Sequence, residues 1–479
     1  MTLIFFGILV KMEYATDTYS VFNFNADQIY VQFASSGRFI TALIGKFIKQ
    51  INMPEIGIYV FSYILAIICM ITSQYKLYKI IEKSIKKQTP EKLNTAIHIL
   101  LPTLIIINPF SIELFLFIEK GIMVFSILMC IYGIENVIKF FEDRELMQNK
   151  LKYLIYATIF MFIANASYQG IVGIFVSILL VYVLNYSKSL KQFIYNNFIV
   201  ILIYGIPAII DYLLIKLFVP VNRLNGQIVI QESLKKIQIN LINITKGMYN
   251  LLPKYVFIFV IIFIFIFFCY KVWNEKKRLL NILKYIYIII GVTFIAVVPQ
   301  IMQPTNSIWF VPRATYCFAS LYGILILYLY IKFKISNLQK AVITIISVFF
   351  LFIQLHQFIK IEQDRYILNG KDYQVSIQII EKIKDYEKET GNEITEISIY
   401  EDKKINYTYD GIFSTGDINI KCYANDWSTV EILKYYLGQN LQFMQKEDEI
   451  AKSFLEKDWN EFNNEQIIFK ENKLNLCKY

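Results

Sequence analysis

The sequence lacks the short motifs by which many soluble enzymes bind nucleotides or zinc. Its 479 residues contain no G-x-x-x-x-G-K-[ST], no G-x-G-x-x-G and no H-E-x-x-H, and histidine occurs only as His98 and His356. Phosphate-binding loops and zinc sites depend on such patterns. The sequence therefore argues against nucleotide-driven transport and zinc-dependent hydrolysis. Both histidines lie in apolar segments, where packing is the expected role.

Cysteine is also sparse and unpatterned. The six cysteines show no metal-ligand spacing, and four of them fall in apolar runs. Cys422 and Cys477, in the polar C-terminal part, are candidates for a disulfide only if that part faces an oxidising compartment. The sequence also lacks an internal repeat or a matched pair of broken apolar segments, which argues against the repeat architectures of many transporters.

Hydrophobic residues are in large excess. They make up 56% of the chain, aromatic residues make up 16%, and the mean hydropathy is +0.46, well above ordinary soluble domains. We predict an α-helical, multi-pass protein of the cell membrane with about 11 transmembrane helices. Several nearly uncharged runs reach, with their flanks, the roughly 20 residues that a spanning helix needs: 58–72, 151–164, 255–270, 285–298 and 341–355.

Charge divides the chain into two parts. Residues 360–479 contain 16 basic and 23 acidic residues, which leaves 32 basic and 15 acidic residues in 1–359, within a net charge of +10. In the acidic part, 373–389 has the pattern of an amphipathic helix and 394–400 alternates as a strand does. We predict a transmembrane domain over residues 1–359 and a small, soluble α+β domain over residues 360–479.

Lysine and arginine orient the membrane part. Their clusters alternate with poorly charged turns and mark the cytoplasmic side, so the segments near 14–54, 220–253 and 300–313 are predicted to face outward. An odd number of spans places the acidic domain outside too. Basic charge in this role is not a nucleic-acid signature, and no nucleic-acid partner is expected. The clusters are 76–92, 139–152, 188–191, 271–284 and 332–340.

Four acidic residues are candidates for chemistry. Asp17 follows the first apolar run on the outer side, where a carboxylate could take a proton from a hydroxyl; the alternative is an N-cap of the next segment. Glu13 and Asp27 are weaker candidates, because Glu13 has an interfacial position and Asp27 stands at the start of a predicted interfacial helix, 29–51. Asp211 lies inside an apolar run, which makes it a candidate by default, although Lys216 is near enough to neutralise it.

Two arginines are candidate phosphate ligands. Arg38 belongs to the pair Gly37-Arg38 on the predicted interfacial helix, and Arg313 to the pair Pro312-Arg313 in an outer segment. Guanidinium groups bind phosphate bidentately and stabilise a phosphate leaving group. The alternative for both is a side chain that reaches out of the apolar phase to lipid phosphates. No set of metal ligands is evident.

This layout resembles a known family. It is similar to that of the bacterial O-antigen-type glucosyltransferases, the type-II Gtr family of the GT-C superfamily of membrane glycosyltransferases. The shared features are a short first span, an acidic outer segment with Asp17, the Gly37-Arg38 pair, about ten apolar spans, the Pro312-Arg313 pair and a small outer C-terminal domain. The resemblance covers nearly the whole chain in layout. One departure is that relatives often carry paired acids in the first loop, whereas Thr18 follows Asp17 here.

The resemblance implies an inverting hexosyltransferase with a GT-C-like fold and no cofactor. Its donor would be glucose on undecaprenyl phosphate, a polyprenyl-phosphate-linked sugar, and its acceptor a surface polysaccharide such as O-antigen. Asp17 would be the base, and Arg38 and Arg313 would hold the donor phosphate. Membrane lipids, a donor synthase and a small flippase are the further candidate partners. Two rival functions stay open: a surface-polysaccharide polymerase or ligase, and a lipid-linked glycan flippase or transporter.

Overall fold

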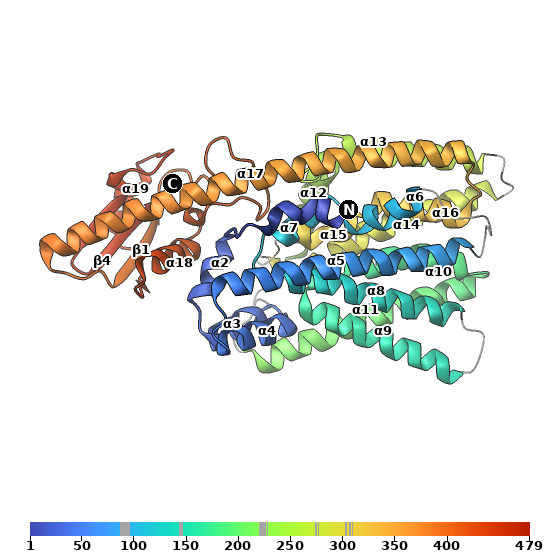
Figure 1. Ribbon diagram of the computed structural model, residues 1–479, viewed down its shortest axis with the longest axis horizontal. Coiled ribbons are helices and arrows are strands. Elements are labelled where there is room, and N and C mark those ends of the chain that lie inside the picture. Colours follow the sequence, from blue (N-terminus) through green and yellow to red (C-terminus); the bar gives the residue numbers. More distant parts are fainter. Residues whose placement is uncertain are drawn as a thin grey trace. The chain divides into compact units, whose positions relative to one another are not determined.

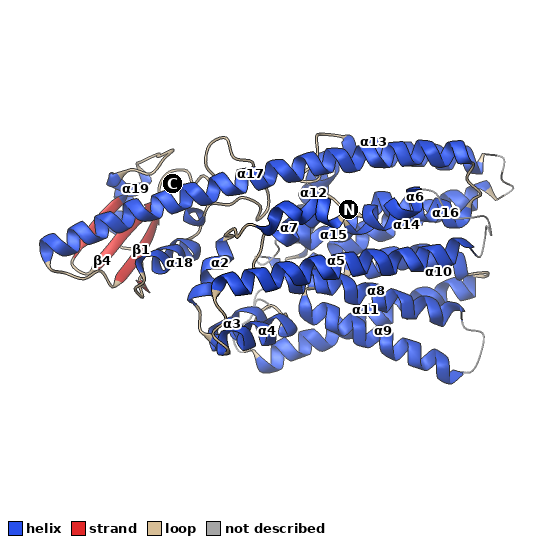
Figure 2. Cartoon of the chain, viewed as in Figure 1, coloured by secondary structure: helices blue, strands red, loops and turns tan. Residues whose placement is uncertain are grey.

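The computed structural model describes residues 1–479 except 87–95, 143–146, 220–226, 228, 274, 276, 302, 303, 306, 307 and 309. Helices dominate, and the strands of the described chain lie near its C-terminus (Figure 2). The chain folds as two compact units. Unit 1 comprises Met1–Val10, Ala26–Phe115 and Glu119–Phe358, and unit 2 comprises Lys11–Asn25, Leu116–Ile118 and Ile359–Tyr479.

Long apolar helices make up most of unit 1. Among the described residues, seven are long and apolar enough to cross a membrane, and α6 (Ala96–Ile106) and α13 (Val256–Val272) are shorter apolar helices. These helices agree with a membrane protein, whereas the number of about 11 spans stays a prediction. The seven are Glu55–Lys86 (α5), Lys120–Glu142 (α8), Gln169–Tyr186 (η2 and α10), Leu190–Phe218 (α11), Arg278–Gln300 (in α14), Pro312–Lys332 (η4, α15 and α16) and Asn337–Thr390 (α17).

Shorter elements complete unit 1. They are α1 (Thr2–Phe6), η1 (Gly7–Val10), α3 (Ala26–Ala34), α4 (Phe39–Gln50), α7 (Ser111–Phe115), α9 (Met147–Ser167), η2 (Gln169–Ile171), α10 (Gly173–Tyr186), α12 (Ile230–Gly247), α14 (Arg278–Ile301), η4 (Pro312–Thr315), α15 (Tyr316–Ala319) and α16 (Leu321–Lys332). Apolar on all sides, α16 is buried throughout Leu321–Ile331, as expected of a helix at the centre of a bundle. In α11, by contrast, large apolar side chains stay exposed, as lipid contact requires.

The described basic clusters of unit 1 share one end. Here α5, α8, α10, α13 and α16 finish, and α9, α11, α14 and α17 begin (Figure 1). The carboxylates at this end pair with lysines: Glu82 with Lys79 and Lys86, and Glu135 with Lys76 and Lys139. The clustering agrees with a single basic side, and its cytoplasmic assignment stays a prediction.

One expectation for the outer segments is wrong. Residues 29–51 are not one helix, because the chain turns between α3 and α4 at Gly37, where φ is +78°. The Gly37 and Arg38 amides bond back to Ala34 (2.9 Å) and Phe33 (3.1 Å), a common helix ending that favours glycine. Segment 220–253, which was predicted to face outward, contains the amphipathic helix α12; its side of the membrane stays a prediction.

Unit 2 is built around a four-stranded sheet of order β2-β1-β4-β3. β1 (Glu396–Glu401) is parallel to β2 (Gln442–Phe443) and β4 (Lys473–Lys478), and β3 (Ile467–Lys470) is antiparallel to β4. The expected helix is the last part of α17, which ends at Thr390 before Gly391, and the expected strand at 394–400 is β1. Further elements are α2 (Thr16–Asn23), η5 (Cys422–Ala424), α18 (Asp426–Leu437), α19 (Asp448–Leu455) and η6 (Asn464–Gln466).

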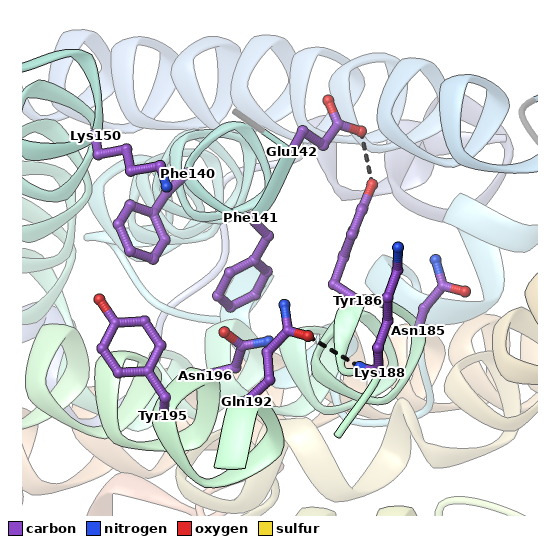
Figure 3. A pocket seen from close by; sticks show the side chains of 10 residues that line it. All are labelled: Phe140, Phe141, Glu142, Lys150, Asn185, Tyr186, Lys188, Gln192, Tyr195 and Asn196. Carbon is purple, nitrogen blue, oxygen red and sulfur yellow. Dashed lines mark hydrogen bonds between the residues drawn. The ribbon is translucent and has the colours of Figure 1, made fainter. Parts of the chain in front are cut away.

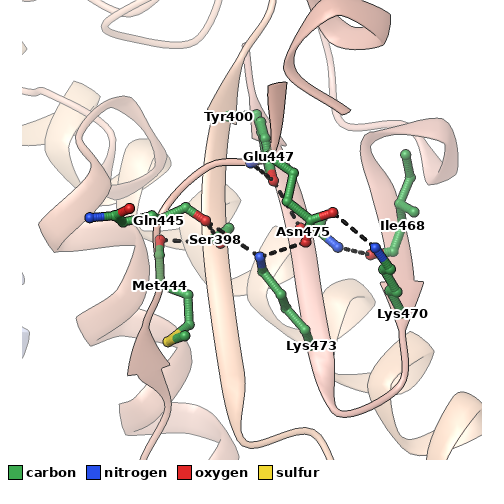
Figure 4. Close-up of polar contacts among 9 residues, drawn as sticks. All are labelled: Ser398, Tyr400, Met444, Gln445, Glu447, Ile468, Lys470, Lys473 and Asn475. Carbon is green, nitrogen blue, oxygen red and sulfur yellow. Dashed lines mark hydrogen bonds and ion pairs between the residues drawn. The ribbon is translucent and has the colours of Figure 1, made fainter. Parts of the chain in front are cut away.

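Both faces of the central strands are covered. Apolar side chains of β1 and β4 pack with Val375, Ile379 and Ile383 of α17 and with residues of α18. Polar groups are satisfied within the sheet (Figure 4): the Tyr400 hydroxyl and the Asn475 amide oxygen lie 3.0 Å apart, and Lys470 and Lys473 both contact Glu447 at 3.0 Å. Cys422 and Cys477 are buried free thiols, so the candidate disulfide is not formed.

Candidate functional site

A buried ion pair holds Arg313 in place. The Arg313 Nη1 lies 2.7 Å from Glu113 Oε1, and its backbone N–H donates to Glu113 Oε2 at 2.5 Å. Glu113 is fully buried and Arg313 is 8% exposed. Pro312 opens η4 with its fixed φ, and Glu113 lies in α7, 200 residues away. Glu113 contacts Nη1 and the backbone N–H of Arg313 and so orients its guanidinium group.

Arg38 is held more loosely. Its guanidinium carbon lies 4.6 Å from the centroid of the Tyr168 ring, and its Nη1 lies 3.7 Å from Glu119 Oε1. The Arg38 Nε has no hydrogen-bond partner among the described residues. Stacking on an aromatic face orients a planar guanidinium while its edges stay available. Arg38 is thus presented as an oriented cation at the turn between α3 and α4.

The turn between α9 and α10 brings the two arginines together. Tyr168 stacks under Arg38, and a Cβ added at Gly170 would lie 2.9 Å from the carbonyl oxygen of Arg313. Burial raises the pKa of the Tyr168 hydroxyl, and the charges of Arg313 and Arg38 oppose this rise. The charges of both arginines therefore influence the same buried tyrosine, although 275 positions separate the two arginines in sequence. Because α8 begins beside Glu119, this cluster lies at the end opposite the basic clusters.

Asp211 joins the cluster through Gln169. The Gln169 amide group donates to Asp211 Oδ2 at 3.0 Å and to the Ser36 carbonyl oxygen at 2.9 Å. Asp211 is 4% exposed, and its Oδ1 has no hydrogen-bond partner among the described residues. Lys216, which the sequence offered as a residue that could partly neutralise Asp211, is exposed and forms no ion pair with it among the described contacts. Asp211 is a buried acid beside the Arg38 turn.

Replacing Gly37 with alanine is expected to destabilise unit 1 by about 1–2 kcal/mol or more. The added Cβ would meet Asp211 Oδ2 and Gln169 Nε2, and the positive φ disfavours any L side chain. Gly205→Ala is the matched control, because no atom lies within 4 Å of a Cβ there and α11 gains a better helix former. Thermal unfolding in detergent measures both variants, and equal stability would contradict the packing of this turn.

Asp17 lies in unit 2, on α2, and is half-buried. It occupies the first turn but not the cap: α2 is capped at Ala15, whose N–H donates to the Thr18 hydroxyl at 2.9 Å. The N-cap alternative for Asp17 is therefore wrong. The Asn23 amide bonds to the backbone and the carboxylate of Glu431 on α18, both at 2.8 Å, which fixes the helix that carries Asp17.

The other acidic candidates have different surroundings. Glu13 is buried in unit 2. Asp27 lies in the first turn of α3 in unit 1, as predicted, and its exposed carboxylate pairs with Lys46 at 2.8 Å. The position of Asp27 is thus explained by a surface ion pair. Among the described residues, no group of three or more His, Cys, Asp or Glu side chains could hold a metal ion.

Several residues of these clusters escaped sequence reasoning. Glu113, Glu119 and Tyr168 position the arginines, and in unit 2 Arg365 is fully buried with its Nε and Nη2 unpaired among the described residues. Glu113 and Glu119 interrupt an otherwise apolar stretch that follows the outer turn at Pro109. Ionisable residues in such a stretch are functional candidates, and this signal could have found them.

Comparisons with known proteins yielded no match to a family model, to a curated protein or to a solved structure.

Proposed function

We propose that this chain is an integral membrane glycosyltransferase that moves a glucosyl residue from a polyprenyl phosphate to a surface polysaccharide on the extracytoplasmic side. The observation that carries the proposal is that Arg38 and Arg313 both lie against the turn that contains Tyr168 and Gly170, at the end of unit 1 opposite its described basic clusters. Oriented guanidinium groups suit the phosphate of a lipid-linked donor. The GT-C class and the family resemblance belong to the same proposal.

The two arginines would stabilise the leaving group. In the transfer, an acceptor hydroxyl oxygen forms a bond to the anomeric carbon while the bond from that carbon to the phosphate oxygen breaks. Negative charge then grows on the departing polyprenyl phosphate. Preorganised cations aimed at that charge lower the barrier to the reaction. The contact of Glu113 with Arg313 and the ring of Tyr168 under Arg38 supply this preorganisation.

Asp17 would accept the proton that leaves the acceptor hydroxyl. A positioned carboxylate can take a proton from a hydroxyl group, and Asp17 is carried on α2, a helix fixed by the contacts of Asn23 with Glu431. One-step displacement of the phosphate inverts the configuration at the anomeric carbon. No nucleotide and no cofactor takes part, in keeping with the missing nucleotide-binding motifs.

Reconstitution with labelled undecaprenyl-phosphate-glucose tests the proposal. Proteoliposomes with the full chain and acceptor polysaccharide are expected to transfer label, and Arg38→Gln to lower the rate by about 10²–10³-fold, the usual cost of removing one charge-stabilising donor. Lys49→Gln, on the neighbouring helix α4, is the control and is expected to keep the rate. If proteoliposomes with the wild-type protein transferred no more label than protein-free liposomes, the proposal would be overturned.

Product analysis separates the rival functions. A transferase adds a single sugar branch, whereas a polymerase or ligase changes chain length or joins whole glycans. A flippase would move the labelled lipid across the bilayer and leave the sugar–phosphate bond intact. Label that stays on the lipid while changing leaflet would therefore favour transport.

A further inference from the structure

A pocket lies at the basic end of unit 1, away from the arginine cluster. It has a volume of about 770 Å³, within the range of small-molecule sites. Figure 3 shows side chains of α8, α10 and α11 with Lys150 of α9 around it. Its walls are Phe140, Phe141, Glu142, Lys150, Asn185, Tyr186, Lys188, Gln192, Tyr195 and Asn196.

Among the described residues, positive charge outnumbers negative charge around the pocket. Among its described lining residues the only carboxylate is Glu142, which Lys83 approaches to 2.7 Å and to which the Tyr186 hydroxyl donates at 2.6 Å. Lys150 and Lys188 line the pocket and have no ion-pair partner in the described part of the chain. The pocket therefore offers two ammonium groups to an anion, and its acid is already neutralised.

Neutral donors stand beside these cations. The Gln192 side-chain oxygen accepts the Lys188 backbone N–H at 3.0 Å, which leaves the Gln192 NH₂ group to donate to a ligand (Figure 3). Asn196 also lines the pocket, and its NH₂ group donates to the Ser187 hydroxyl at 3.0 Å, so Gln192 is the amide donor on which the argument rests. Amide donors together with ammonium groups match the oxygens of a phosphate group.

The pocket adjoins lipid-facing surfaces on two packed helices, α9 and α11. Exposed apolar side chains recur at helical spacing along each helix from the pocket toward the other end. Acyl or prenyl chains could lie along these stripes while a polar head occupies the pocket. The stripes are Leu151, Ile155 and Ile159 on α9, and Leu190, Ile194, Phe198 and Ile201 on α11.

We propose that this pocket binds the phosphate head group of an anionic membrane lipid, with Lys150 and Lys188 as its cationic ligands. Basic pockets between helices on the cytoplasmic side are suited to such head groups, because anionic lipids concentrate in that leaflet. The lipid would brace the junction of α8, α9 and α11. This inference is independent of the transfer reaction, since it concerns the opposite end of unit 1.

Lipid retention by the purified full chain tests the inference. The protein is delipidated in detergent and titrated with phosphatidylglycerol, with undecaprenyl phosphate and with zwitterionic phosphatidylcholine, and bound lipid is counted by native mass spectrometry. Lys150→Gln/Lys188→Gln is expected to weaken binding of the anionic lipid by about 10- to 30-fold, from the usual contribution of two lysines. Lys152→Gln/Lys191→Gln removes the same charge from the same end without touching the pocket, and is expected to change binding by about 3-fold or less.

The three lipid titrations identify the class of lipid that binds, and the two double variants can contradict the assignment of the site. Tight binding of phosphatidylglycerol indicates a phosphodiester lipid, and binding of undecaprenyl phosphate alone indicates a prenyl monoester; either supports the pocket. Equal losses in both double variants would overturn it, because general surface charge would then account for binding. Equal retention of phosphatidylcholine, or full displacement by an equal concentration of soluble glycerol phosphate, would overturn an anionic lipid ligand.

Discussion

Asp17→Asn is expected to lower the rate of sugar transfer by about 10²–10⁴-fold, the usual contribution of a positioned general base. The asparagine keeps the size of the side chain, and the Ala15 and Thr18 cap of α2 does not involve residue 17. Folding should therefore be preserved. The measurement is the initial rate of glucose transfer in proteoliposomes that contain equal amounts of protein.

A matched acidic residue serves as the control for Asp17. Asp27→Asn removes another acid of the N-terminal segment, but one whose exposed carboxylate pairs with Lys46 at the surface, and its effect should stay within about 2-fold, as is typical of a surface ion pair. A rate for Asp17→Asn close to the wild type would end the assignment of Asp17 as the base.

Glu113→Ala is expected to destabilise unit 1 by about 3–5 kcal/mol, because it leaves the guanidinium of Arg313 buried without the carboxylate that contacts it. Unfolding in detergent can be followed with a thiol-reactive dye, since Cys130 and Cys317 of unit 1 are buried and free. Transfer should fall as well, because Arg313 loses its orientation.

The double variant Glu113→Ala/Arg313→Met separates stability from chemistry. Removing both charges should recover most of the lost stability, since apolar replacement of a buried ion pair is often neutral, and the coupling energy follows from a double-mutant cycle. Transfer should stay low in the double variant, because the charge of Arg313 is lost and Arg38 alone is left to hold the phosphate. If activity returned together with stability, Arg313 would be a structural residue and not a donor ligand.

Much of the architecture could be read from local patterns. Nearly uncharged runs predicted the long helices, and the charge change near residue 360 predicted a separate polar part. The helix ending before Gly391 and the strand at β1 were found where apolar spacing placed them. These features are local, because they depend on hydropathy and periodicity over about 5–20 residues. One local prediction failed, the single helix over residues 29–51, because Gly37 ends α3 there with a positive φ.

The candidate site was only partly predictable. Charge distribution placed Arg38 and Arg313 on one predicted side of the membrane, and in the structure both lie against the turn that contains Tyr168 and Gly170. Their role in a donor site stays a prediction. Charge distribution did not identify Glu113, whose contact with Arg313 joins residues 200 positions apart. It also made Asp27 a candidate for chemistry, whereas in the structure an ion pair with Lys46 at the surface explains the position of Asp27. Contacts of this range depend on how helices pack, which no spacing rule encodes.

The sequence by itself determined the environment of the protein: a strongly apolar, largely helical chain with its lysines gathered at the ends of spans and an acidic C-terminal part. Tertiary structure alone decided that η2 brings Tyr168 under Arg38 and Gly170 against Arg313, that α2 with Asp17 belongs to unit 2, and that Lys150 and Lys188 share a pocket. The physical reason is that burial depends on composition along the chain, whereas the pairing of charges depends on which distant helices fill each other's grooves.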